Sequence, residues 1–253
     1  MALLDIQSIE VEFDGFRAVD RVSLALEAGE LVGLAGTNGA GKSTVFGAVA
    51  GQVAITRGAI RFAGQDITRL PAHRRASMGL GRTFQVPREF GSLSVLDNLL
   101  AASPDEGHES LLAAWFARAS ARQTDGRLTE RADELLGLTR LSALRGQPAS
   151  ALSGGQKKLL ELARAMMRAP TCLLLDEPFA GVNPVLIDQL IEVLRAIHAR
   201  GVALIVIEHH LQALKSLVPR LLVMDQGQVI ADGAPAAVLD DARVRTAYMG
   251  GVV

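Results

Sequence analysis

The chain has 253 residues, of which 49% are hydrophobic, and its formal net charge at pH 7 is −1. This apolar fraction can form a packed core and excludes global disorder. A charge near zero argues against nucleic-acid binding by bulk electrostatics, and one cysteine excludes a disulfide framework or a cysteine-based zinc site.

The N-terminal residues 1–13 mix acidic with apolar residues and lack a basic segment, so we expect no secretory signal there. The longest apolar runs, such as 202–207, are far shorter than the ~18 residues that span a bilayer. We therefore expect a soluble protein of a reducing compartment, whose membrane role, if it has one, comes through a partner.

The first strands of the chain are predicted to be antiparallel. Phe13-Asp-Gly-Phe16 predicts a turn, Val22–Leu26 a strand, and the alternating segment 59–68 contains a second turn at a glycine. These features predict an antiparallel sheet beside a parallel one.

A phosphate-binding loop follows the apolar run Leu31–Ala35, which predicts a strand buried on both faces. The next residues fit G-x-x-x-x-G-K-[ST], in which glycines let backbone N–H groups point inward. Lys42 can reach the β- and γ-phosphates and Ser43 can offer its hydroxyl to Mg²⁺. The alternative is a chance glycine-rich turn, which the flanking strand and helix disfavour. We assign the whole loop to nucleotide binding: Gly36, Thr37, Asn38, Gly39, Ala40, Gly41, Lys42, Ser43 and Thr44.

The middle of the chain is predicted to be helical, most clearly over 111–122 and 129–138. We expect one domain, 1–253, whose core comprises 1–85 and 165–253, with an inserted helical lobe at about 86–164. Within this lobe, Leu-Ser-Gly-Gly-Gln at 152–156 opens a helix. A serine and two glycines at a helix start predict a second anion-binding terminus.

A second buried strand, 171–175, ends in the adjacent carboxylates Asp176 and Glu177. The carboxyl ends of parallel strands share one edge of the sheet, so both side chains are expected near the phosphate loop. Asp176 suits the Mg²⁺ shell, and Glu177 suits orientation or deprotonation of the attacking water. The alternative is an acidic turn that caps the strand. Cys172 is predicted to be a small buried residue rather than a reactive thiol.

The last third predicts a strand-helix-strand crossover, with helical spacing over 187–197 and a third buried strand over 202–207. Segment 221–230 predicts a hairpin around 225–227. The fold class is therefore α/β, with a parallel sheet, an antiparallel part and inserted helices.

The ordered motifs at 36–44, 152–156 and 173–178 resemble those of ATP-binding cassette (ABC) proteins. The resemblance implies a P-loop NTPase cassette with a RecA-like parallel core, an antiparallel β subdomain and a helical subdomain. In that family two cassettes close head to tail. The segment Ser153, Gly154, Gly155 and Gln156 is then implied to bind nucleotide in trans.

The resemblance implies roles for three further residues. Phe13 would stack on adenine, Gln85 would take part in metal binding and coupling, and His209 would contact the γ-phosphate. The alternatives are a core role for Phe13 and a helix-capping role for His209; its neighbour His210 is expected to have no chemistry. Asn183 stands where the family often has an aspartate that contacts the partner cassette.

Segments 79–85, 180–184, 207–209 and 247–250 resemble the ATP-binding subunits of branched-chain amino-acid importers. This implies an ATPase that uses ATP and Mg²⁺ on the inner face of the cell membrane. Its partners would be permease subunits, a second cassette of the same or a related chain, and indirectly a periplasmic binding protein, with no nucleic acid. The alternatives are an ATPase of lipopolysaccharide export or urea import, a soluble ABC ATPase, or a cassette that binds without hydrolysis.

Overall fold

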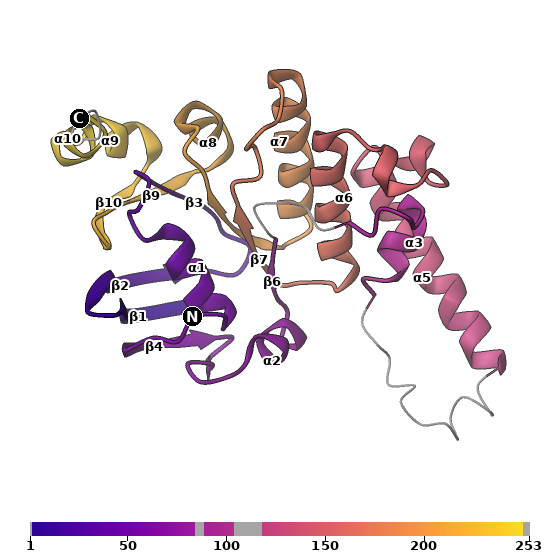
Figure 1. Cartoon of the computed structure of the whole chain (residues 1–253), viewed down its shortest axis with the longest axis horizontal. Helices are drawn as coiled ribbons and strands as arrows, with labels where there is room; N and C mark the ends of the chain where they lie inside the picture. The colour runs from indigo at the N-terminus through magenta and orange to yellow at the C-terminus, as the bar shows by residue number, and fades with distance from the viewer. Residues whose placement is uncertain (1, 84–88, 104–117, 250–253) are drawn as a thin grey trace. The chain divides into compact units, whose positions relative to one another are not determined.

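The computed structural model describes residues 2–83, 89–103 and 118–249. The chain divides into two compact units (Figure 1). The first unit comprises Met1–Gln85, Pro170–Ala180 and Ile187–Val253, and the helical unit comprises Val86–Ala169 and Gly181–Leu186. The sequence placed the end of the helical lobe at 164, which falls inside helix α6 (Gly154–Met167). This helix continues for one further turn and belongs to the helical unit.

An antiparallel sheet begins the first unit, as its alternating residues predict. Its strand order is β2-β1-β4-β5, and β1 and β2 meet at the expected turn, with Phe13 opposite Phe16. Figure 1 shows β1, β2 and β4 side by side in indigo and violet. The strands are β1 (Leu4–Phe13), β2 (Phe16–Leu26), β4 (Arg57–Phe62) and β5 (Gln65–Asp66).

A second sheet has the order β10-β9-β3-β8-β7-β6, and all of its neighbouring pairs are parallel except β9 and β10. The three apolar runs predicted to be doubly buried correspond to β3, β7 and β8, and every residue of these strands is buried. The second predicted run began one residue early, because Thr171 is exposed and precedes β7. The predicted hairpin is confirmed as β9 and β10. The strands are β3 (Leu31–Gly36), β6 (Leu80–Arg82), β7 (Cys172–Asp176), β8 (Ala203–Ile207), β9 (Arg220–Asp225) and β10 (Gln228–Gly233).

Helix α1 (Lys42–Ala50) lies between the two sheets (Figure 1), and its apolar residues share one core with side chains from both. This packing fixes the helix start against the end of β3. The predicted helix over 187–197 lies within α7 (Pro184–His198). The other helices of the first unit are α2 (Ala72–Ser77), α8 (Leu211–Leu217), α9 (Pro235–Asp240) and α10 (Ala242–Met249).

The helical unit contains α3 (Val95–Leu100), α5 (Arg118–Leu138) and α6. From Arg118 onward the helical segments predicted most clearly, 111–122 and 129–138, belong to one continuous helix, α5. It includes Gly126, and one glycine costs a helix interior only about 1 kcal/mol. Residues 111–117 lie outside the described part of the chain.

The predicted α/β fold class is confirmed. In the described ranges no helix is long and apolar enough to cross a membrane.

Candidate functional site

The loop after β3 needs glycine because neighbouring backbone lies very close. Gly36 has φ +149° and Gly41 has φ +94°. A Cβ at Gly36 would collide with the carbonyl oxygen of Met224, and one at Gly41 with that of Ala18. Because the backbones of β2 and β9 lie directly against the loop, the fold itself requires glycine at both positions, with or without a ligand.

The turn between β9 and β10 also holds this loop. Thr37 Oγ1 donates a hydrogen bond to Asp225 Oδ1 (3.3 Å), and the Gly227 N–H donates to the carbonyl of Ala40 (3.2 Å). On its other side, Gly227 accepts from the Asp20 N–H (2.9 Å). Sequence reasoning missed Asp225, since its partner lies far away in the chain.

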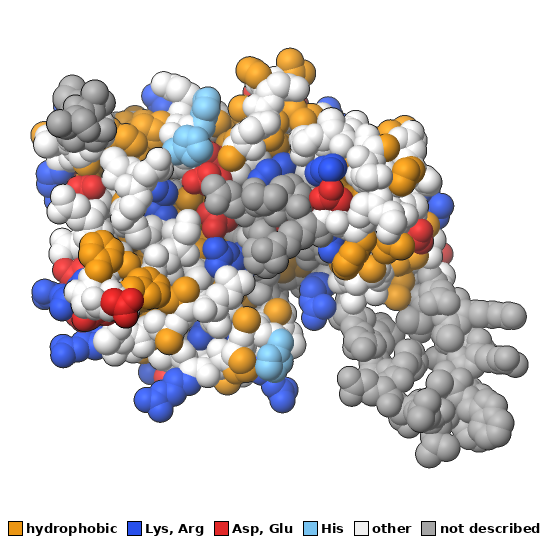
Figure 2. Space-filling view, in the orientation of Figure 1, with side chains coloured by type: hydrophobic (Ala, Val, Ile, Leu, Met, Phe, Trp, Pro, Cys, Tyr) orange, Lys and Arg blue, Asp and Glu red, His pale blue; other side chains and the backbone are white. Residues whose placement is uncertain are grey.

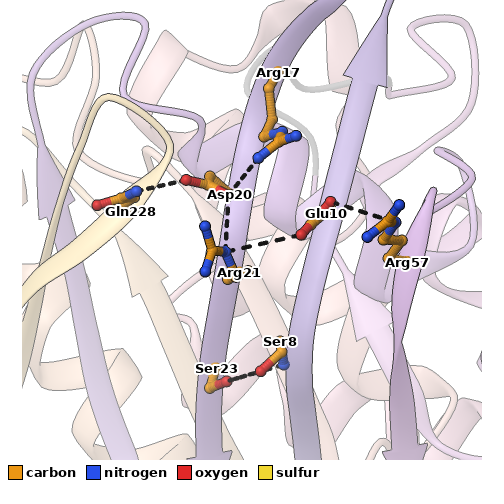
Figure 3. Close-up of polar contacts among 8 residues, drawn as sticks. All are labelled: Ser8, Glu10, Arg17, Asp20, Arg21, Ser23, Arg57 and Gln228. Carbon is orange, nitrogen blue, oxygen red and sulfur yellow. Dashed lines mark hydrogen bonds and ion pairs between the residues drawn. The ribbon is translucent and has the colours of Figure 1, made fainter.

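Asp20 secures this arrangement through its side chain. Figure 3 shows its carboxylate between the guanidinium groups of Arg17 and Arg21 on β2 and the amide of Gln228 on β10. The amide of Gln228 and the guanidinium of Arg17 lower the pKa of Asp20. The carboxylate therefore joins the antiparallel sheet to the hairpin that touches the phosphate loop.

Lys42 is the first residue of α1, and only 6% of it is exposed. Its Nζ donates to the carbonyl oxygens of Gly36 and Thr37, both at 2.8 Å. Burial lowers the pKa of Lys42, and the nearby charges of Glu177 and Asp176 oppose that shift. The ammonium group therefore lies beside the carboxylates at the end of β7, as the shared sheet edge predicts.

Asp176 is held at the end of β7. Its Oδ2 accepts a hydrogen bond from Arg82 Nη2 (2.8 Å), and its N–H donates to Thr83 Oγ1 (3.4 Å). The side chain of Asp176 is only 6% exposed. Sequence reasoning named Arg82 only as part of a motif and missed this ion pair.

Glu177 occupies a left-handed backbone conformation, with φ +49°. Its N–H donates to the carbonyl of Ile207 at the end of β8 (3.0 Å), and its carbonyl accepts from the Ala180 N–H (3.1 Å). Its Oε1 lies 3.8 Å from Nδ1 of His209. Figure 2 shows histidine side chains in pale blue next to acidic side chains in red on this face. The structure thus brings Lys42, Asp176, Glu177 and His209 together.

The two adjacent histidines differ in role. His210 Nδ1 accepts the Ala213 N–H (3.2 Å) and caps α8. His210 is exposed, and the structure gives it no part in the chemistry of this site; its ring has a structural role, because it satisfies a backbone donor at a helix start. The capping role considered for His209 belongs to His210.

Glu208, which sequence reasoning also missed, directly precedes His209 and is fully buried. Its Oε1 accepts the Phe179 N–H at 2.7 Å. Burial raises the pKa of the Glu208 carboxyl, and hydrogen bonds from the backbone of Phe179 and His210 oppose that shift only in part.

The remaining assigned residues of the first unit have contrasting surroundings. Phe13 is 49% exposed at the β1–β2 turn, where Figure 2 shows apolar side chains in orange, so its alternative role in the core is excluded. Cys172 is buried as predicted, and burial raises the pKa of its thiol to about 12. Gln85 lies outside the described residues.

In the helical unit, Ser153 caps α6 as its sequence predicts. Its Oγ accepts the Gln156 N–H (3.4 Å), while Gln156 Oε1 accepts the Ser153 N–H (2.8 Å). A Cβ at Gly155 would overlap the side chain of Leu186, which would have to move. Asn183 Oδ1 accepts the Leu186 N–H (3.0 Å) at the start of α7.

The oxygen atoms of Asp176 and Ser43 also fit the needs of a Mg²⁺ ion. A magnesium ion bound with a nucleotide usually takes one or two protein oxygens and completes its shell with phosphates and water. Asp176 and the exposed Ser43 provide a carboxylate and a hydroxyl of this kind. Within the described residues no larger group of acidic, histidine or cysteine side chains could hold a metal alone.

A buried strand, a glycine loop, a lysine at a helix start and a carboxylate pair on one sheet edge define a P-loop nucleotide-binding protein. Comparison with family models narrows this class. A family model described as ABC transporter matches residues 19–180, and the chain belongs to this family of nucleotide-binding ATPases coupled to transport. A second model, described as branched-chain amino acid ATP-binding cassette transporter, matches residues 228–253.

Similar proteins cover almost the whole chain. The probable branched-chain amino acid transport ATP-binding protein LivG of Archaeoglobus fulgidus is 36% identical, with coverage of 99% of this chain and 96% of the relative. The lipopolysaccharide export ATP-binding protein LptB of Acidithiobacillus ferridurans is also 36% identical, with coverage of 98% and 97%. A crystal structure of the ADP conformation of an ABC transporter cassette has 33% identity, a TM-score of 0.85 and 99% coverage of both chains.

Proposed function

We propose that this ATPase powers the import of branched-chain or related amino acids through a separate permease. The observation that carries the substrate class is the match of residues 228–253 to the branched-chain amino-acid model. Lipopolysaccharide export is the second candidate, because a relative named for it has the same identity as the amino-acid relative.

In the proposed mechanism, the first unit holds one ATP. Backbone N–H groups of 36–44 and the Lys42 ammonium bind the phosphates, and the exposed ring of Phe13 stacks on adenine. Ser43 and Asp176 would hold Mg²⁺, with Gln85 as a further ligand. When bound, this ion supplies positive charge that offsets the charge of the phosphates.

Hydrolysis requires a positioned water molecule. Glu177 orients this water and accepts its proton at a carboxylate oxygen, while the water oxygen bonds to the γ-phosphorus and the bond to ADP breaks. His209, whose Nδ1 lies 3.8 Å from Glu177 Oε1, donates to the γ-phosphate. Residues 153–156 of a second cassette complete the site from the opposite side.

The proposed transport function also implies partner proteins. The chain would work at the inner face of the cell membrane with permease subunits, a second cassette of the same or a related chain, and indirectly a periplasmic binding protein. The lack of a membrane-spanning helix in the described ranges accords with docking on a separate permease.

The catalytic assignment is tested with Glu177→Gln. We expect ATP binding to persist and hydrolysis to slow by about 10²–10⁴-fold, the range for a positioned acid or base. Glu192→Gln, on the exposed side of α7, is the control. Normal turnover in Glu177→Gln would remove Glu177 from this role.

The substrate class needs a separate experiment. The chain is co-expressed with permease subunits for branched-chain amino acids and, in parallel, with the lipopolysaccharide export permease. We expect co-purification and amino-acid-stimulated ATP turnover only with the first. Assembly with the export permease alone would contradict the import proposal without affecting the ATPase assignment.

A further inference from the structure

Glu208 occupies a central position at the catalytic edge of the parallel sheet. Ile207, the last residue of β8, pairs with Leu34 of β3 on one side and with Asp176 of β7 on the other. The N–H of Glu208 donates to the Leu34 carbonyl (3.3 Å). Glu208 therefore stands between the strand that enters the phosphate loop and the strand that carries the carboxylate pair.

The side chain of Glu208 turns inward rather than toward solvent. It is 0% exposed, and its Oε1 accepts the Phe179 N–H at 2.7 Å. Its Oε2 has no hydrogen-bond partner within the described part of the chain. A carboxyl group buried with one oxygen unsatisfied is costly, so its hydrogen bond with the backbone of residue 179 needs an explanation beyond filling space.

That contact lies in the turn that carries Glu177. A left-handed φ of +49° is unfavourable for a residue with a side chain, and such strain persists only where the surroundings hold it. Two hydrogen bonds join this turn to the end of β8. The Glu177 N–H donates to the carbonyl of Ile207, and the Phe179 N–H donates to Glu208.

We propose that Glu208 is a positioning residue for ATP hydrolysis. Its carboxyl oxygen holds the backbone of residues 177–180 and so fixes the direction of the Glu177 side chain. Because His209 follows directly, one strand end places both groups that face the γ-phosphate. The inference rests on the proposed role of Glu177 as the base. It requires an acceptor oxygen at position 208 and not a negative charge.

The test compares Glu208→Leu, which replaces the carboxyl group with an apolar side chain of similar size and so removes the acceptor, with Glu208→Gln, which retains a carbonyl oxygen. Both are measured in the full chain for kcat, ATP affinity and Tm. We expect Glu208→Leu to lower kcat by about 10–100-fold, the scale of a misplaced catalytic group. Its ATP affinity should stay within about threefold. Glu208→Gln should keep kcat within about threefold of the wild type.

Three results would overturn the inference: an unchanged kcat in Glu208→Leu, a loss of ATP affinity as large as the loss of kcat, or equal loss in both variants. Glu177→Gln is measured alongside. If it turns over ATP normally, the proposed function fails. If only Glu208→Leu turns over normally, the role of Glu208 fails alone.

A second measurement does not depend on the folding of Glu208→Leu. Amide hydrogen exchange of segment 176–180 is followed in the wild type and in Glu208→Gln. We expect the Phe179 amide to be protected in both, because both retain the acceptor. Fast exchange of this amide in the wild type would contradict the proposed hydrogen bond and with it the inference.

Discussion

Helices α1 and α6 both begin at glycine-rich motifs, yet their N-termini differ. α1 starts after Gly41, and none of the described side chains caps it. α6 starts after Ser153, where a reciprocal capping box joins Ser153 and Gln156. The sequence alone predicts anion binding at both helix starts.

The two helix starts differ in how their first backbone N–H groups are satisfied. At α1 the N–H groups of the first turn have no acceptor within the helix, and the Lys42 ammonium binds the carbonyl oxygens of Gly36 and Thr37 in the preceding loop. At α6 side chains already satisfy part of the helix end, which stabilises it by about 1 kcal/mol. In the proposed mechanism, a phosphate that another cassette presents at α6 would share or replace these bonds.

The largest expected effect comes from removing the Lys42 ammonium group at the uncapped start of α1. Lys42→Ala should weaken ATP binding by at least about 10²-fold, since charged hydrogen bonds contribute ~1.5–3 kcal/mol each. Titration with a fluorescent ATP analogue checks this. Lys215→Ala, in the last turn of α8, is the control. Unchanged affinity in Lys42→Ala would show that the α1 start is not the phosphate site.

Two glycines of the same loop provide a matched pair. Gly41→Ala places a methyl group against the Ala18 carbonyl, whereas Gly39→Ala, at φ +81°, meets nothing within 4 Å. We expect Gly41→Ala to lower the free energy of unfolding by about 2–6 kcal/mol, from backbone strain plus overpacking. Gly39→Ala should lose only ~1–2 kcal/mol. Equal losses in urea unfolding would show that close approach of β2 does not require Gly41.

Much of this site could be predicted because its signals are local. The run Leu31–Ala35 has no polar residue, which is typical of a doubly buried strand, and the loop after it has a distinctive spacing. Asp176 and Glu177 stand directly after another such run. Parallel strands end at the same edge of a sheet, so both signals predict groups at that edge.

The residues that were missed act through long-range contacts. Asp225 binds Thr37, Arg82 binds Asp176, and Glu208 binds the backbone at residue 179. Each is an ordinary charged residue at or near the end of a strand, with no local spacing that distinguishes it. Their partners depend on strand order in the sheet, which the local pattern does not specify.

A smaller effect tests the capped start of α6. Ser153→Ala removes the cap of α6 and should lower the free energy of unfolding by ~1 kcal/mol, which shifts the Tm of a chain of this size by about 2–4 °C. Ser43→Ala, at the start of α1, should leave the Tm unchanged because Ser43 does not cap that helix. Equal losses in the two variants would remove the distinction between the helix ends.

The smallest expected effect on stability separates capping from phosphate binding at α6. Gln156→Glu keeps an oxygen for the Ser153 N–H and adds negative charge to the first turn, which should stabilise the chain by about 0.3–1 kcal/mol. The charged form of this glutamate is favoured in the folded state, so its folded pKa lies below the unfolded value near 4.3. The gain should therefore be present above about pH 4.3, disappear as the pH falls through the folded pKa, and shrink in high salt.

The same substitution should have the opposite effect on function. Two unit charges 4 Å apart repel by ~1 kcal/mol even in water, so a carboxylate at position 156 should slow ATP turnover at least about fivefold if a phosphate must approach it. Stability and turnover are measured on the same preparation. A chain that becomes more stable with unchanged turnover would show that the α6 start meets no phosphate, and its capping box would then be purely structural.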